Sequence, residues 1–318
     1  MKFTARTLWH IPLVLLGLTM LMPLFLMFTT SLGTARMALD PGESLWHIFI
    51  PRMWRWHNYV DVLRGNVGLD PRHPAQVDFL RYYANSVVVA IGVTLGHVLT
   101  SACAAYAFAR LRWPGRDRIF LAYLATMMVP VPVTLIPQFA IIKHIPEWLQ
   151  VIIPWVNWTG LRYLGTSATA PLIGRLAGMD SFFSLIVPGM FSAYGTFLLR
   201  QFLLTIPREL DEAARIAGAT HWQTFSRVIL PLARPGLATL AIFTYMGAWS
   251  NLIWPLVVLN LESMYTLPLG MQEFQGQSGT QWHLMMGASL LVVLPVIVVF
   301  FIGQRSFIRG LTVGAVKG

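Results

Sequence analysis

The sequence predicts an all-α polytopic membrane protein with six transmembrane helices. Of its 318 residues, 56% are hydrophobic and only 11% are charged, whereas a globular protein has about 25% charged residues. Six apolar segments reach the length of roughly 20 residues that a helix needs to cross a bilayer core. The basic residues gather on alternate connecting segments, and this distribution orients the spans.

The six predicted spans include several prolines, which are tolerated where neighbouring helices satisfy the freed backbone groups. The apolar runs lie at 9–29, 86–109, 119–142, 182–204, 236–259 and 284–303. The first run is longer than the h-region of a signal peptide, roughly 7–15 residues. We therefore interpret it as a membrane anchor.

The charge distribution predicts that both termini are cytoplasmic. With that orientation the cytoplasmic segments hold 14 basic and four acidic residues, and the outer segments hold nine of each. The whole formal net charge of +10 then lies inside, as the positive-inside rule expects. Because topology explains this charge, we predict no nucleic-acid partner, and we expect membrane lipid to surround the spans.

The chain is interpreted as one membrane domain with an N-terminal addition. We assign residues 1–81 to the first helix and an external loop, 82–309 to the transmembrane domain and 310–318 to a cytoplasmic tail. The domain contains an external insertion at 143–181, in which Trp148, Trp155 and Trp158 are expected to be interfacial aromatic residues. It also contains a charged cytoplasmic loop at 206–231, which we call the cassette.

The first half of the cassette has the pattern of a short helix. Pro207 suits the first turn of a helix, and Glu209, Asp211 and Glu212 follow where the helix dipole favours negative charge. Gly218 then offers the left-handed backbone that ends a helix.

The second half of the cassette predicts another helix. Thr220 and Gln223 fit a capping box. The helix is expected to run from about His221 to Leu230 and to stop at Pro231. Two short helices joined by a glycine elbow suit docking onto a partner, and they equally suit an amphipathic hairpin that rests on lipid headgroups.

The spacing of the cassette resembles the EAA loop of binding-protein-dependent ABC importer permeases. That pattern is E-A-A, three residues, G, nine residues, I, one residue, L-P, and the chain has valine in place of isoleucine. The matching residues are Glu212, Ala213, Ala214, Gly218, Val228, Leu230 and Pro231. The resemblance implies the type I ABC importer permease fold, with cytoplasmic coupling helices that bind an ATPase. It assigns ATPase coupling to Glu209, Glu212, Ala213, Ala214, Gly218, Leu230 and Pro231.

Other segments resemble the carbohydrate branch of this family, and in particular the second permease of maltose and multiple-sugar importers. They include "ANSVVVA", "AAYAFARLRWPGR", "WPLVVL", "YTLPLG" and "FIRGLTVGAVKG". The resemblance implies a bacterial cytoplasmic (inner) membrane protein that works with a homologous permease subunit, an ABC ATPase dimer and an extracytoplasmic sugar-binding protein. The chain departs from the family in three places: Ala217 replaces an acid, Trp249-Ser250-Asn251 replaces W-N-D, and the 143–181 loop is longer.

Polar residues inside the spans suggest a translocation path, because intramembrane polar groups face the bundle interior or a substrate route. The candidates are Gln138, Tyr194, Thr244, Trp249, Ser250 and Asn251. Aromatic faces with neutral hydrogen-bonding groups suit a sugar. The alternative role of these residues is hydrogen bonding between helices.

The sequence predicts a transport subunit with no catalytic residues, no metal and no cofactor of its own. None of its three lysines fits a P-loop, which requires Gly-Lys followed by Ser or Thr, so ATP and Mg are expected on the partner ATPase. One alternative is a stand-alone ion-coupled secondary transporter, which favours intramembrane acids, and the six runs contain none. Another alternative is an ABC permease for a non-sugar solute.

Overall fold

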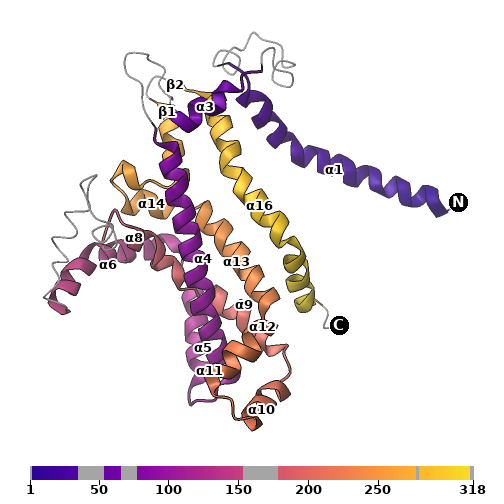
Figure 1. Ribbon diagram of the computed structural model, residues 1–318, viewed down its shortest axis with the longest axis vertical. Helices are drawn as coiled ribbons and strands as arrows, with labels where there is room; N and C mark the ends of the chain where they lie inside the picture. The colour runs from indigo at the N-terminus through magenta and orange to yellow at the C-terminus, as the bar shows by residue number, and fades with distance from the viewer. Residues whose placement is uncertain (1, 35–53, 66–76, 153–177, 277–278, 316–318) are drawn as a thin grey trace. The chain divides into compact units, whose positions relative to one another are not determined.

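The computed structural model describes residues 2–34, 54–65, 77–152, 178–276 and 279–315. These residues form helices and one two-stranded antiparallel ladder, β1 (Gln275–Gly276) with β2 (Gly279–Thr280) (Figure 1). The longer helices are α1 (Lys2–Ser31), α3 (His57–Arg64), α4 (Phe79–Arg110), α5 (Arg116–Ala125), α6 (Val131–Ile152), α9 (Ala193–Leu204), α10 (Glu209–Ile216), α13 (Arg234–Trp249) and α16 (Trp282–Ala315). The shorter helices are η1 (Thr126–Met128), α8 (Phe182–Ile186), η3 (Pro188–Met190), α11 (His221–Gln223), η4 (Thr224–Ile229), α12 (Leu230–Leu232), α14 (Ile253–Val258), η5 (Glu262–Met264), α15 (Leu267–Gly270) and η6 (Met271–Phe274).

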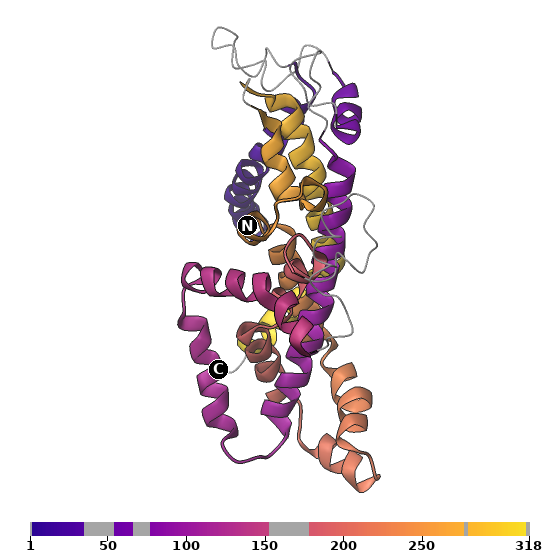
Figure 2. The ribbon, with the colours of Figure 1, turned by 90° about the vertical axis from the view of Figure 1, so that its left-hand side faces the viewer.

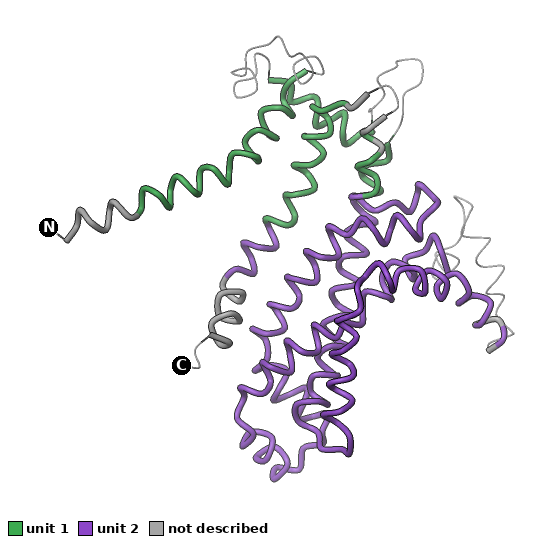
Figure 3. Tube along the Cα trace, turned by 180° about the vertical axis from the view of Figure 1, so that it is seen from behind, with its two compact units in different colours: residues 1–82, 269–297 green, residues 83–268, 298–318 purple. Residues whose placement is uncertain are grey.

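The chain divides into two compact units, coloured separately in Figure 3. Unit 1 comprises 1–82 and 269–297, and unit 2 comprises 83–268 and 298–318. In unit 1 the amide of Asn58 on α3 donates to the carbonyls of Ser31, at 2.7 Å, and of Gly33, at 2.9 Å. The hydroxyls of Ser31 and Tyr59 also form a hydrogen bond, at 2.7 Å. These bonds fasten α3 to the end of α1.

Three of the six predicted spans are long helices, and each of the other three overlaps a bent pair of helices. Helices of spanning length and hydropathy run over His10–Ser31, Phe79–Arg110 and Trp282–Gln304. The bent pairs are Arg116–Met128 with Val131–Trp148, Phe182–Met190 with Ala193–Leu204, and His221–Leu232 with Arg234–Trp249. Their bends are 101°, 41° and 76°. The count of six holds when each bent pair is one span. In the third pair only Arg234–Trp249 overlaps the predicted fifth span, because His221–Leu232 belongs almost entirely to the predicted cytoplasmic cassette.

The third predicted span, 119–142, is broken near its middle. Val129 adopts an extended backbone, with φ −76° and ψ 119°, and the next residue is Pro130. A residue before proline is pushed away from the α-helical region by contact with the proline ring. The chain therefore turns by 101° into α6, a turn that Figure 2 shows from the side. Helix α6 extends to Ile152, and Trp155 and Trp158 lie outside the described residues.

The fifth predicted span, 236–259, is wrong at its C-terminal end. Helix α13 stops at Trp249, and α14 is a separate short helix. The side chain of Asn251 accepts a hydrogen bond from the backbone N–H of Trp254, at 3.3 Å. Asparagine competes with helical backbone bonding in this way, and Pro255 has no amide hydrogen to donate. Both effects favour a break after Trp249.

The core of unit 2 joins α4, α9, α13 and the second half of the cassette. Its buried apolar residues are Ala102, Ala105, Tyr106 and Ala109 from α4, Leu199, Leu203 and Ile206 from α9 and its end, Phe225, Ile229 and Ala233 from the cassette and its end, and Leu240 from α13. The three alanines of α4 let neighbouring backbones approach closely. This cluster lies at the end of α4 where Figure 1 labels α10 and α11.

Candidate functional site

The first half of the cassette folds as a short helix with a glycine elbow, as the sequence predicts. Helix α10 carries Glu209, Asp211 and Glu212 in its first turn. Gly218 has φ 80°, which confirms the predicted left-handed position. The N–H of Ala219 bonds back to the carbonyl of Ala214 at 2.9 Å, a bond that satisfies an orphan carbonyl at the helix end. Pro207 lies before the helix rather than in its first turn, because α10 begins at Glu209.

The second half of the cassette begins as predicted and ends later. The capping box is confirmed, since Gln223 N–H donates to Thr220 Oγ1, at 3.3 Å, and Thr220 N–H donates to Gln223 Oε1, at 2.8 Å. The predicted stop at Pro231 is wrong, because the helical chain continues to Leu232. The six residues before Leu230 form a π-helix. Pro231 lacks an amide hydrogen for the carbonyl four residues earlier, that of Arg227, and Arg227 lies within this wide turn.

The second half of the cassette presses one face into the core of unit 2. Phe225 and Ile229 are buried, and the ring of Phe225 lies 5.0 Å from that of Tyr106 on α4. The hydroxyl of Tyr106 donates to the carbonyl of His221 at 3.3 Å. The cassette is therefore seated on the spans through both apolar and polar contacts.

Arg110, the last residue of α4, fastens the first half of the cassette. Its Nη1 lies 2.9 Å from Oδ2 of Asp211, and their side chains are 4% and 17% exposed. Its Nη2 donates to the carbonyls of Leu203, at 2.7 Å, and Ile206, at 2.8 Å. One guanidinium therefore binds α10 and the end of α9 together. We did not predict this anchor; the sequence offered only an arginine at the end of a span and an aspartate in a first helical turn.

The opposite face of the cassette is exposed and combines apolar and acidic side chains. Ile216 is 88% exposed and Trp222 is 65% exposed. Leaving such large apolar side chains in contact with water is unfavourable. Of the predicted coupling residues, Glu209, Glu212, Ala213, Gly218 and Pro231 are exposed, whereas Ala214 and Leu230 are partly buried. Exposed apolar residues among charges are typical of a protein interaction surface.

A separate cavity of about 450 Å³ lies among the helices of unit 2. It is lined by Gln138, Tyr194, Thr244 and Asn251 from the predicted path, together with mainly apolar side chains. No Asp, Glu, Lys or Arg is among the described residues that line it. The structure therefore brings four of the six candidates to one uncharged cavity.

Trp249 and Ser250 are not among the residues that line this cavity. Trp249 is buried, and its ring lies 5.7 Å from that of Tyr245 in a stacked arrangement and 5.5 Å from that of Tyr83 edge-on. The hydroxyl of Ser250 donates to the carbonyl of Met246 at 2.8 Å. Trp249 is thus a packing residue in this conformation, and Ser250 bonds to its own helix.

Two cavity-lining residues have buried polar atoms without a partner in the described chain. They are His97, through Nε2, and Thr266, through Oγ1. A buried polar group without a hydrogen bond carries a desolvation cost of about 1–3 kcal/mol. In the sequence, the only indication that His97 could belong to a functional site is that it is a polar residue inside a predicted span. Thr266 stands outside all six predicted spans, so reasoning from spans missed it.

The comparisons with known proteins agree with the family that the sequence resembles. Residues 92–313 match the family described as binding-protein-dependent transport system inner membrane component. The chain is 32% identical over 310 residues to an sn-glycerol-3-phosphate transport system permease protein, UgpE, of Pectobacterium atrosepticum, which covers 95% of this chain and 94% of the relative. It is 28% identical over 305 residues to the arabinooligosaccharides transport system permease protein AraQ of Bacillus subtilis, with 96% and 93% covered.

A solved structure shares the fold. One chain of a bacterial ABC transporter involved in the import of the acidic polysaccharide alginate superposes with a TM-score of 0.70 and 21% sequence identity. The superposition covers 95% of this chain and 97% of that chain. The likeness extends over nearly the whole length of both proteins.

Proposed function

We propose, from the premise that the chain belongs to the binding-protein-dependent transport system inner membrane component family, that it is one permease subunit of an ATP-driven sugar importer in the bacterial cytoplasmic membrane. Its partners are a homologous permease, two copies of an ABC ATPase and an extracytoplasmic sugar-binding protein. ATP and Mg bind to the ATPase copies. Both termini of the permease are cytoplasmic.

The observation that carries this proposal is the two-sided construction of the cassette. Its inner face is fixed to α4 and α9 by the Arg110–Asp211 ion pair and by Phe225. Its outer face presents Ile216 and Trp222 to the surroundings. A hairpin that only rested on headgroups would need no buried ion pair to the end of a span. A surface that transmits force needs both a docking face and a rigid seat.

The coupling mechanism rests on two conformations of the assembled transporter, which bind nucleotide with different affinities. Closure of the ATPase dimer on ATP moves the docked cassette. Because the cassette is packed against α4 and α9, those helices move with it. The spans then change from inward-open to outward-open, the binding protein delivers its solute, and hydrolysis resets the cycle.

The uncharged cavity supports a neutral solute. Gln138, Tyr194, Thr244 and Asn251 offer hydrogen bonds without net charge, and an anion in a mainly apolar cavity without a cationic partner is costly. The arabinooligosaccharide permease similarity agrees with an oligosaccharide. A second candidate is a phosphorylated polyol, which is favoured by the similarity to an sn-glycerol-3-phosphate permease.

The test is reconstitution of the chain with its sibling permease, ATPase and binding protein in liposomes. We expect ATP hydrolysis to be stimulated by neutral oligosaccharides in the presence of the loaded binding protein, and not by sn-glycerol-3-phosphate. Stimulation by the phosphorylated polyol alone would transfer the substrate assignment to the second candidate. Solute uptake by the purified chain without any ATPase would refute the importer proposal itself.

A further inference from the structure

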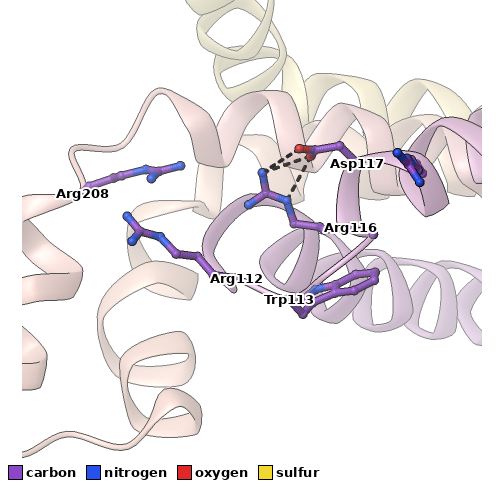
Figure 4. Close-up of a pocket in the computed structure, with 7 residues that line it drawn as sticks. Arg112, Trp113, Arg116, Asp117 and Arg208 are labelled. Atoms are coloured by element: carbon purple, nitrogen blue, oxygen red, sulfur yellow. Dashed lines mark hydrogen bonds and ion pairs between the residues drawn. The ribbon is translucent and has the colours of Figure 1, made fainter.

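A basic pocket lies at the entry to the cassette, and it shares no residue with the uncharged cavity. It has a volume of about 650 Å³ and is lined by Arg112, Trp113, Gly115, Arg116, Asp117, Arg118 and Arg208. Four arginines face one aspartate, and the pocket lies between the end of α4, the start of α5 and the first residue before α10. Figure 4 shows Arg112 and Arg208 extending into the same space.

The aspartate of this pocket is already paired. Asp117 accepts from Arg116 through both carboxylate oxygens, at 3.0 Å from Nε and 3.2 Å from Nη2. Arg116 also donates to the carbonyl of Leu111 at 3.2 Å, and the guanidinium of Arg200 lies 3.9 Å from the same carboxylate. The single negative charge is thus held by two cations on one side of the pocket.

The remaining arginines are paired with no carboxylate, although Arg112 and Arg208 also line an adjoining pocket that holds Asp211 and Glu212. Within the described ranges, Arg112, Arg118 and Arg208 form no ion pair or side-chain hydrogen bond, and all three are exposed. Like charges that approach one another are destabilising, and an anion bound between them removes the repulsion. Forked guanidinium groups match the oxygens of a phosphate. The chemistry that the pocket recognises is a phosphate ester.

The surroundings distinguish a lipid headgroup from a free phosphate. Next to Arg118 on α5, Ile119 is 52% exposed and Leu121 is 69% exposed, so large exposed apolar side chains lie on the same helix as the basic rim. Trp113 lies against Phe108, with ring centroids 5.8 Å apart, and tryptophan is enriched where a membrane meets water. Basic pockets between membrane helices on the cytoplasmic side bind anionic headgroups. A headgroup with acyl chains fits both surfaces, whereas inorganic phosphate fits only the first.

We infer that this pocket binds the phosphate of an anionic phospholipid, held between Arg112, just after α4, and Arg208 at the entry to the cassette. The bound lipid connects the membrane surface to the cassette, because Arg208 directly precedes α10. The site requires only that the chain lies in a membrane, so its test does not depend on which solute is transported.

The experiment counts lipids retained by the assembled transporter in native mass spectrometry. The complex is purified from equimolar phosphatidylcholine and phosphatidylglycerol. The wild type is compared with the double variant Arg112→Gln/Arg208→Gln and with Arg227→Gln, a matched control. Arg227 is an exposed arginine of the cassette outside this pocket. Size-exclusion chromatography of each variant confirms that the complex remains assembled.

We expect the wild type and Arg227→Gln to retain phosphatidylglycerol in preference to phosphatidylcholine. The double variant should bind it about 25-fold more weakly, from about fivefold for each arginine near the surface. Equal retention by the double variant and the control overturns the site. Displacement of the lipid by inorganic phosphate at equal concentration overturns the lipid assignment in favour of a free anion. Loss of the ATPase from the double variant with unchanged lipid count assigns the pocket to a protein contact instead.

Discussion

Replacing Arg110 by methionine should loosen the cassette from the spans without removing the spans from the membrane. The guanidinium makes an ion pair with Asp211 and two hydrogen bonds to the carbonyls of Leu203 and Ile206. Methionine fills much of the same volume but satisfies none of these groups. The carboxylate of Asp211, 17% exposed, then loses its ion-pair partner and has little solvent to replace it.

The magnitude follows from the burial of the pair. Breaking a buried ion pair by removing one partner costs about 3–5 kcal/mol, and both side chains here are exposed by far less than a third. Since 1.36 kcal/mol is a factor of ten, amide hydrogen exchange in 206–216 should accelerate by about 150- to 5,000-fold. Exchange in the middle of α4 should not change. The sugar-stimulated component of ATP hydrolysis should fall in parallel.

Three further variants separate the ion pair from other causes. Arg110→Lys keeps the charge but loses the fork that reaches three oxygen atoms, so its effect should be intermediate. Arg110→Met with Asp211→Leu leaves no unpaired charge and should be less damaging than Arg110→Met alone. Arg234→Met, at an exposed position at the start of α13, should behave as the wild type. Unchanged exchange in 206–216 of Arg110→Met would refute the anchor.

Three predictions concern the elbow, the cavity and the topology. Gly218→Leu should strain the left-handed backbone by roughly 1 kcal/mol or more and reduce co-purification of the ATPase, whereas Gly218→Asn should retain it; wild-type co-purification with leucine contradicts a coupling role. Asn251→Ala should change the solute dependence of ATP hydrolysis while membrane insertion persists, and an unchanged solute range means that this side chain does not meet the solute. With Cys103 replaced by alanine, a cysteine at Thr220 should be labelled only from the cytoplasm and one at Glu262 only from outside; outside labelling of position 220 in intact cells contradicts the orientation.

The elements that follow from local rules were predictable from the sequence. The glycine elbow, the Thr220–Gln223 capping box and the acidic first turn of α10 depend on residues within a few positions of one another. Hydropathy likewise located the long helices α1, α4 and α16. Local backbone and side-chain preferences decide these features before any tertiary contact forms.

The features that were not predicted from the sequence depend on contacts between residues far apart in the chain or on breaks inside apolar runs. Arg110 and Asp211 meet across about 100 positions, so neither residue alone indicates the anchor. The break after Val129 was available from the rule for residues before proline, but the apolar run around it suggested continuity. Trp249 was chosen for the path because it is aromatic, yet burial against Tyr83 and Tyr245 decides its role.

The cavity and the cassette are built on the same helices, and this explains how motion at one reaches the other. Helix α4 lines the cavity at His97 and holds the cassette at Arg110, 13 residues and therefore about 20 Å further along a rigid helix. Helix α13 lines the cavity at Thr244 and belongs to the cassette's core at Leu240. Close-packed interiors transmit displacement rather than absorb it. Under the proposed mechanism, a cassette pulled by a closing ATPase would shift two walls of the cavity together, and the solute path would need no separate relay.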